Sequence, residues 1–227
     1  MDIHKPKPWH GLREFLKEYL IIVVGVLTAL GAEQAVEAIH HHEQVEQTRA
    51  ALRSEMKRMV TTALINQRSS HCFVTVLGEY DAWARGGAKP AWRPPETAKG
   101  GGSVWEEARA GGVVGYMDLD ERLTFSRFYG QVANQSSLVD VEREFVRQLG
   151  GFLNLDTLDH ADAQALLREL GGHRGLVRVM IANDGQIIDL GRKLGVTPSA
   201  PEPAQQQRLD ALCREADQWS RAAGAKG

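Results

Sequence analysis

The sequence predicts an all-α protein with one membrane-spanning helix. Three observations lead to this fold class: an uninterrupted apolar run from Tyr19 to Ala32, apolar residues that recur beyond it at spacings of three, four or seven, and the lack of any segment with convincing strand alternation. We therefore expect an N-terminal transmembrane helix that continues into a long stalk helix. An up-down bundle of about four long helices and one short helix should follow.

The apolar run carries basic residues on its N-terminal side only, and this asymmetry predicts the orientation of the chain. Four basic residues precede it, Lys5, Lys7, Arg13 and Lys17, and no Lys or Arg follows until Arg49. Basic residues beside a span stay in the cytoplasm. We therefore expect residues 1–18 to form a cytoplasmic stub, residues 19–39 to anchor the chain in a bacterial inner membrane, and residues 40–227 to form a periplasmic helical bundle.

The run alone is short for a span, because a helix needs about 20 apolar residues to cross the hydrocarbon core. Apolar residues up to Ile39 keep one face apolar after Glu33 and Glu37 have made the other face polar, which extends the stripe to about 31 Å. Two alternatives stay open. Ala29 and Gly31 would suit the end of a cleaved signal peptide, whereas a buried helix of a soluble protein leaves the one-sided basic flank without a cause.

Small residues form one face of the predicted anchor. Gly25 and Ala29 lie one turn apart, as do Thr28 and Ala32, and Glu33 lies near the outer edge of the apolar run. Such a face lets a second membrane helix approach closely. We expect Gly25, Thr28, Ala29, Ala32 and Glu33 to contact another membrane protein or a second copy of the chain. The alternative is that small residues are common in spans and that Glu33 only marks the outer interface.

The chain has two cysteines, Cys72 and Cys213, and no Cys-x-x-Cys motif. An oxidising periplasm would permit a disulfide between them, which would tie the first long helix to the last. The alternative is two buried thiols that behave as small hydrophobic residues. The sequence leaves these two possibilities equal.

The stretch from His40 to about Ala84 continues the first helix. It contains no proline, and its apolar residues keep helical spacing: Val45, Leu52, Met56, Met59, Ala63, Phe73, Val76 and Tyr80. Ser69, Ser70 and Gly78 are positions where this helix could bend. Residues 85–102 carry three of the eight prolines and glycine at both ends, so we expect a loop, with Trp92 docked on the edge of the core.

Capping patterns define the next two helices. Ser103 with Glu106 predicts a capping box for a short helix that ends at Gly111, and Trp105 and Tyr116, on either side of it, should plug the end of the bundle. Asp118 with Glu121 repeats the pattern. The helix it starts runs to about Leu149, with apolar positions at Leu123, Phe125, Phe128, Val132, Leu138, Val141, Phe145, Val146 and Leu149.

Two further helices complete the bundle. The first runs from about Leu158 to Leu194, and the Gly171–Gly172 pair inside it is a place where it could kink or split in two. Residues 195–203 form a Pro-rich linker. The last helix, from Ala204 to Ala222, places its apolar residues on one side: Leu209, Leu212, Cys213, Ala216 and Trp219.

Two segments, EFLKEYLIIVVGVLTALGAEQ and VWEEARAGGVVGYM, resemble a group of bacterial single-pass inner-membrane proteins of unknown function. The resemblance covers the first ~60 residues and the segment from Trp105 to Met117. It implies a basic N-terminal stub, one anchor helix and a helical extracytoplasmic domain. It implies no catalytic residues.

Composition and motifs argue against several function classes. Acidic and basic residues are mixed along the helices and the formal net charge is -2, so we expect no nucleic-acid partner. The sequence contains no nucleophile elbow, phosphate-binding loop or dinucleotide fingerprint. We therefore expect no enzymatic activity, no catalytic residues and no cofactor.

The best metal candidate is the cluster EAIHHHEQVE, in which Glu37 and His40 have Glu-x-x-His spacing. A di-iron site needs a second copy of this motif, and only His160 and His173 remain as distant ligands. The alternative is a solvated, pH-sensitive segment at the headgroup boundary, and we expect no metal.

The function that the sequence favours is a non-catalytic, membrane-anchored interaction or accessory protein, either a scaffold or a subunit of a larger membrane complex. The alternative is a periplasmic ligand-binding bundle that acts as a sensor module through a partner. A roomy pocket lined by apolar faces would favour the ligand-binding alternative, whereas a filled core with exposed apolar residues would favour the scaffold.

Overall fold

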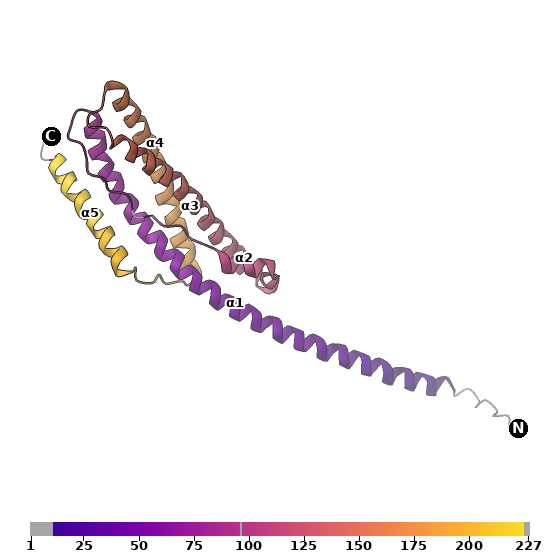
Figure 1. Ribbon diagram of the computed structural model, residues 1–227. Helices are drawn as coiled ribbons and strands as arrows, with labels where there is room; N and C mark the ends of the chain where they lie inside the picture. Colours follow the sequence, from indigo (N-terminus) through magenta and orange to yellow (C-terminus); the bar gives the residue numbers. More distant parts are fainter. Residues whose placement is uncertain (1–10, 96, 225–227) are drawn as a thin grey trace. The chain divides into compact units, whose positions relative to one another are not determined.

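The computed structural model describes residues 11–95 and 97–224, and every regular element in them is helical (Figure 1). The predicted all-α fold class is therefore confirmed. The elements in chain order are α1 Leu12–Ala84, α2 Ser103–Ala110, the 3-10 helix η1 Val113–Tyr116, α3 Leu119–Phe152, α4 His160–Lys193 and α5 Pro203–Gly224. Of the basic residues expected in the cytoplasm, Lys5 and Lys7 lie outside the described residues.

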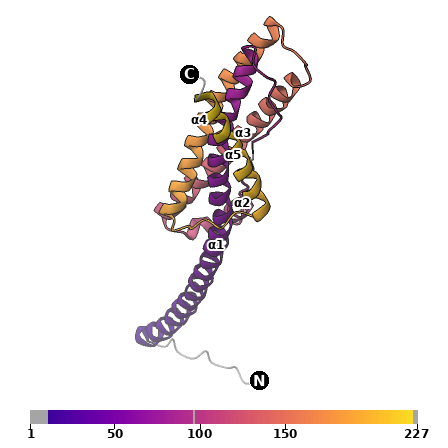
Figure 2. The ribbon, with the colours of Figure 1, turned by 90° about the vertical axis from the view of Figure 1, so that its left-hand side faces the viewer.

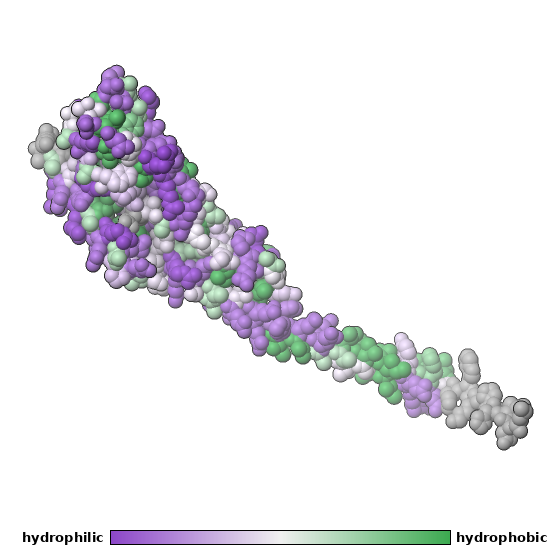
Figure 3. Space-filling model, viewed as in Figure 1, coloured by the Kyte–Doolittle hydropathy of each residue, from purple (hydrophilic) through white to green (hydrophobic). Residues whose placement is uncertain are grey.

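The chain divides into two compact units, Met1–Gln47 and Thr48–Gly227. In the first unit, α1 exposes almost all its large apolar side chains; Ile21, for example, is 70% exposed and Val36 is 67% exposed. Figure 3 shows these apolar residues as green patches along the first part of α1. This part of α1 is long and apolar enough to cross a membrane, and its most apolar window has no buried residue. These properties are typical of a membrane anchor or of a signal sequence.

The second unit is a bundle in which α1, α3, α4 and α5 run alongside one another (Figures 1 and 2). The predicted apolar face of α1 is buried from Leu52 to Tyr80. Toward the end of α1, Phe73, Leu77 and Tyr80 form a cluster with residues of the other three long helices: Leu149, Leu166, Leu170, Leu212 and Ala216. Helical spacing identified this face because each predicted position follows the last by about one to three turns.

α1 continues as one helix through Gly78, where the sequence allowed a bend. This glycine makes room for a neighbour: a Cβ atom added there would lie 2.2 Å from the ring of Trp219 on α5. Gly171 and Gly172 do not interrupt α4 either, and no neighbour lies within 4 Å of a Cβ added at either position. α4 is therefore not split at this pair, because a helix tolerates glycine in its interior at a cost of about 1 kcal/mol each.

Helix capping differs from the sequence patterns at two places. Ser103 and Glu106 form no capping box; Gly102 is the N-cap of α2 and no side chain caps it from within the helix. Asp118 does cap α3, by accepting hydrogen bonds from the backbone N–H groups of Asp120 and Glu121. The Glu121 carboxylate, however, binds Arg49 of α1 and does not return to the cap. The two predicted capping glutamates pair with arginines instead, Glu121 with Arg49 of α1 and Glu106 with Arg109 of its own helix.

The connections agree with the prediction in outline. The described residues between Arg85 and Gly102 contain no helix, and neither do residues 195–202. Pro203 was expected in the linker but is the first residue of α5, a position where its missing N–H costs no helical hydrogen bond. A capping box that the sequence analysis missed starts α4, with Asp159 and Asp162 each accepting from the other's backbone N–H.

Candidate functional site

The predicted contact face lies on α1 in the first unit, and Gly25, Thr28, Ala29, Ala32 and Glu33 are all exposed. No atom lies within 4 Å of a Cβ added at Gly25. The Thr28 hydroxyl donates a 2.7 Å hydrogen bond to the Val24 carbonyl of the same helix. Its polar group is therefore satisfied without a second helix, and the open side of this face is built from small side chains.

Cys72 of α1 and Cys213 of α5 form a disulfide with an S–S distance of 2.00 Å. Of the two alternatives that the sequence left open, the structure shows the bonded pair. Their Cα atoms are 5.0 Å apart, although 141 residues separate them in sequence. The bond fastens the last helix to the first.

The His40–His42 cluster lies on α1 in the first unit, where the Nε2 atoms of His40 and Gln44 are 2.9 Å apart. Among the described residues, no group of three or more His, Cys, Asp or Glu side chains is arranged to hold a metal ion. His160 is exposed at the start of α4, whereas His173 is buried in the bundle.

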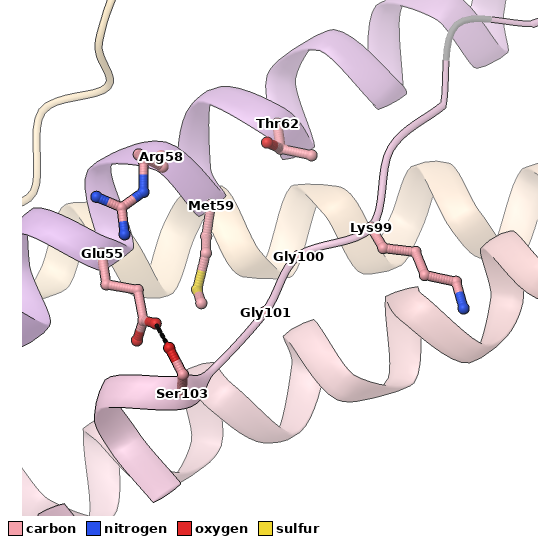
Figure 4. Close-up of a pocket in the computed structure, with 8 residues that line it drawn as sticks. All are labelled: Glu55, Arg58, Met59, Thr62, Lys99, Gly100, Gly101 and Ser103. Carbon is pink, nitrogen blue, oxygen red and sulfur yellow. Dashed lines mark hydrogen bonds between the residues drawn. The ribbon is translucent and has the colours of Figure 1, made fainter. Parts of the chain in front are cut away.

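A cleft of about 280 Å³ lies between α1 and the glycine run that leads into α2 (Figure 4). Its carboxylate, Glu55, is only 4% exposed and accepts three hydrogen bonds, from the Ser103 hydroxyl, the Val104 backbone N–H and the Tyr129 hydroxyl. Burial, together with the bond to Glu55, raises the pKa of Tyr129 above its usual range. Glu55 thus caps α2 from a different helix, which is a structural role.

Of the two basic residues that line this cleft, Lys99 is already paired with an acid. Lys99 pairs with Asp140, and Figure 4 shows its amine directed away from Glu55. Gly100 is required for packing, because a Cβ atom there would lie 2.6 Å from Cγ1 of Val132. The glycine run therefore serves close contact between the loop and α3, as expected for a segment without the preceding strand of a phosphate-binding loop.

The interior of the bundle holds a second polar group of residues, centred on Asp184 of α4. The Gln135 amide donates to Asp184 Oδ2 at 3.0 Å, and the Asn183 amide donates to Gln135 Oε1 at 2.9 Å. Asp184 Oδ1 has no hydrogen-bond partner and the residue is fully buried. It lines a cavity of about 10 Å³, which is room for about one water molecule.

Glu142 of α3 acts on the ionisation of Asp184 inside the bundle. Burial and the nearby charge of Glu142 raise the pKa of Asp184 to about 8. Glu142 on α3 is also fully buried, and neither of its carboxylate oxygens has a hydrogen-bond partner. Burial raises the pKa of Glu142 to about 7, against smaller opposing effects of Thr97 and Arg143. Burial therefore shifts both carboxyl groups toward the protonated, uncharged form, Asp184 more than Glu142.

His173 is the third buried ionisable group. Its ring stacks on Phe145 at a centroid distance of 3.8 Å and meets the ring of Phe73 edge-on at 5.5 Å. Both ring nitrogens lack a hydrogen-bond partner, and burial lowers the pKa of His173 to about 4. The group is neutral near pH 7, and it has no partner that would orient it as a catalytic base.

The sequence analysis missed Glu142 and placed Val141 on the buried face of α3. In the structure Val141 is 57% exposed and Glu142 is buried, as are Val139 and Phe145. The expectation that Leu123 is buried is also wrong, since it is 45% exposed. Because an acid occupies a core position here, a helical face assigned from apolar residues alone was placed one position too early. Counting in steps of three from Val139 to Phe145 would have included Glu142.

The aromatic residues divide between core and surface. Trp105 is buried and stacks on Tyr129 at a centroid distance of 5.3 Å, as expected for a plug at the end of the bundle. Tyr116 is 58% exposed, so the same expectation is wrong for it. Trp92 lies against Gly150, 3.5 Å from a Cβ added there, but stays 45% exposed.

No protein-family model, curated protein or solved structure matches the chain. The resemblance to bacterial single-pass membrane proteins therefore stays a prediction, and functional reasoning depends on the residues themselves.

Proposed function

We propose that this chain is a non-catalytic, membrane-anchored interaction or accessory protein. Residues 19–39 cross the inner membrane, the N-terminus faces the cytoplasm, and the helical bundle lies in the periplasm. The observation that carries this proposal is the exposure of the large apolar side chains on the first part of α1. In water such a surface would be costly, at about 25 cal/mol for each Å² of apolar area.

The disulfide supports a periplasmic location for the bundle. Structural disulfides persist in oxidising compartments and are rare in the cytosol. The bond between Cys72 and Cys213 lies within the bundle. The orientation that the basic flank predicts brings both cysteines to the oxidising side.

The interior of the bundle supports a binding role over catalysis. Glu55, the carboxylate of the cleft described above, already accepts three hydrogen bonds within the bundle. Asp184, Glu142 and His173 are buried, and the cavity beside Asp184, of about 10 Å³, has room for about one water molecule. The partner of the proposed scaffold is another membrane protein or a second copy, which contacts the face formed by Gly25, Thr28, Ala29, Ala32 and Glu33.

Alkaline extraction of membranes tests the anchor. The full-length chain should stay in the membrane pellet, and release of a shorter soluble form would show a cleaved signal peptide instead. A reporter enzyme fused after α5 tests the orientation. If the bundle lies in the periplasm, a reporter that works only in an oxidising compartment should be active. Activity restricted to a cytosolic reporter would contradict the proposed topology.

Crosslinking between anchors tests the contact face. Gly25→Leu with Ala29→Leu fills the small-residue face and should abolish crosslinks to a second copy or to another membrane protein. Val23→Leu with Leu27→Ile changes the opposite face of the same helix and should leave the crosslinks intact. Equal crosslinking in both double variants would remove this face from the proposal.

A groove of about 390 Å³ between α1 and α5 keeps the ligand-binding alternative open. Apolar residues form most of its surface, among them Leu64, Ile65 and Leu209, with Arg68 and His71 also lining it. Native mass spectrometry of the purified chain distinguishes the two functions. A small molecule that co-purifies at a fixed stoichiometry supports a sensor module, and a protein subunit supports the scaffold.

A further inference from the structure

The small cavity beside Asp184 adjoins the cleft between α1 and the glycine run (Figure 4). Met59 and Thr62 of α1 and Gly100 of the loop line both spaces. Figure 4 shows these three residues on the two chain segments that border the cleft. The same residues therefore form the wall between the cavity and the solvent in the cleft.

The exposure of the lining residues indicates where solvent enters. Seven of the nine residues that line the cavity are buried, and the two that are only partly buried are Thr62 and Gly100. A Cβ atom added at Gly100 would lie 2.6 Å from Cγ1 of Val132 and 3.9 Å from Cγ of Met59. Any larger residue at position 100 would thus intrude on the shared wall, and the route from the cleft passes Thr62 and Gly100.

The cavity offers a water molecule enough polar partners. Oδ1 of Asp184 has no hydrogen-bond partner among the described residues, whereas Oδ2 accepts from the Gln135 amide. The Thr62 hydroxyl and the Asn66 amide belong to the other polar residues that line the cavity. Asn66 binds the backbone of Ala98 through one N–H and one lone pair, and it keeps a second of each. A buried water molecule makes about three hydrogen bonds to groups of this kind.

Asp184 is the group that gains most from such a water molecule. A buried carboxyl oxygen without a partner is costly, and a hydrogen bond to water removes much of this cost. Of the described residues that line the cavity, Asp184 is the only ionisable one. Burial and the charge of Glu142 on α3 raise its pKa to about 8, and Lys99, next to Gly100, is paired with Asp140. A proton held at Asp184 near neutral pH needs a path by which it enters and leaves.

We propose that this cavity binds one water molecule, which hydrogen-bonds Asp184 and connects its carboxyl group with the solvent of the cleft past Thr62 and Gly100. Asp184 thereby exchanges its proton with solvent while the bundle stays folded. The site lies wholly within the unit Thr48–Gly227, so the inference goes beyond the proposed function and does not depend on the anchor.

A crystal structure of the full-length chain at a resolution that shows ordered water tests the binding site. We expect one water molecule within hydrogen-bond distance of Asp184 Oδ1 and of at least one further lining group, Thr62 or Asn66. A cavity without water, or a direct bond between Asp184 Oδ1 and another protein group, would overturn the proposal.

Infrared spectroscopy of the full-length chain in detergent tests the route. At pH 6 both buried acids are below their folded pKa values of about 7 and about 8. The C=O stretching band that Asp184→Asn removes from the spectrum therefore belongs to protonated Asp184, and it shifts when deuterium replaces the proton after transfer to D₂O. Thr62→Val keeps the side-chain shape and removes the hydroxyl. Thr124→Val is the matched control, because Thr124 is also half-buried but bonds the Asp120 carbonyl of its own helix.

We expect the Asp184 band of the wild type to shift much faster than the backbone N–H groups in the core exchange, since those wait for the bundle to open. Thr62→Val should slow the shift roughly tenfold, and Thr124→Val should leave its rate unchanged. A wild-type band that shifts only as fast as the core N–H groups exchange would overturn the route, as would equal rates in the wild type and Thr62→Val. Lack of any band that Asp184→Asn removes would show that Asp184 is ionised and would overturn the proton exchange. An intact Cys72–Cys213 disulfide, seen as a mobility difference on reduction, shows that each variant has folded.

Discussion

The first part of α1 and the bundle place the same kinds of side chain in opposite environments. Residues 12–39 expose Leu, Ile and Val, whereas the bundle buries these residues and also buries Glu142, Asp184 and His173. An exposed apolar helix is stable only where the surroundings are apolar, and a buried acid only where it is uncharged or paired. The comparison teaches that each region suits a different surrounding: the proposed membrane for the first part of α1, and the interior of the folded chain for the buried side chains of the bundle.

The largest expected effect comes from making the exposed helix polar. Val26→Asp with Leu30→Asp places two charges in the proposed span, at a cost of about 3 kcal/mol each near its centre. We expect the chain to lose its resistance to alkaline extraction. Val141→Asp with Val179→Asp, at exposed positions of the bundle, should leave extraction unchanged. Full retention of the first variant in the pellet would show that residues 19–39 do not span a membrane.

Removal of the disulfide should have the next largest effect, and it concerns the bundle alone. Cys72→Ser with Cys213→Ser releases a loop that spans 141 residues. We expect a loss of about 2 to 5 kcal/mol in the free energy of unfolding, measured on the full chain in detergent by denaturant titration. A reducing agent should destabilise the wild type by a similar amount and leave the double variant unaffected. A wild type that is insensitive to reduction would contradict a structural role for the bond.

The buried acids should make the bundle less stable as the pH rises. The folded pKa values of Glu142 and Asp184 are raised to about 7 and about 8, so the folded state holds protons that the unfolded state releases. Stability therefore falls with pH, by at most about 1.4 kcal/mol per pH unit for each acid. His173 acts in the opposite direction only between about pH 4 and its unfolded value near 6.5.

Denaturation midpoints at pH 6.5 and pH 8 isolate the contribution of the acids, because His173 is neutral in both states across most of this range. We expect the wild type to lose roughly 2 kcal/mol between the two values. Glu142→Gln with Asp184→Asn should remove most of this loss, because the amides do not ionise. If the stability of the double variant fell with pH as much as that of the wild type, other groups would be responsible for the pH dependence.

The smallest expected effects distinguish two glycines with different surroundings. Gly78→Ala places a methyl group 2.2 Å from the ring of Trp219, so α5 must shift, and we expect a loss of about 1 to 3 kcal/mol. Gly171→Ala meets no atom within 4 Å and should stabilise α4 by about 0.5 to 1 kcal/mol. Thermal unfolding of both variants in detergent measures the difference. A stabilising Gly78→Ala would contradict the close contact with Trp219.

Local patterns predicted the existence of every long helix. The buried positions of α1 from Leu52 to Tyr80 follow directly from helical spacing, and proline and glycine located the loop at 85–102. Bounds differed by a few residues, as for α3, which continues to Phe152. The spacing of apolar residues predicts the helices well because the repeat of about 3.6 residues per turn determines which residues share a face, whatever packs against it.

Capping, by contrast, was predicted less well because it depends on distant residues. The sequence assigned Glu106 and Glu121 to capping boxes, whereas the structure gives the α2 cap to Glu55 of α1 and joins Glu121 to Arg49. A sequence pattern within α2 does not reveal that the buried carboxylate of Glu55, on another helix, accepts three hydrogen bonds there.

The sequence by itself determined the helical class, the apolar helix near the N-terminus and the separation of the chain into helical segments, since these depend on neighbours within one or two turns. Only the tertiary structure decided that Cys72 meets Cys213, that Gly78 accommodates Trp219, and that Glu142 and Asp184 lie inside the bundle. Those outcomes depend on residues far apart in the chain. Their distances are fixed only when the helices pack together.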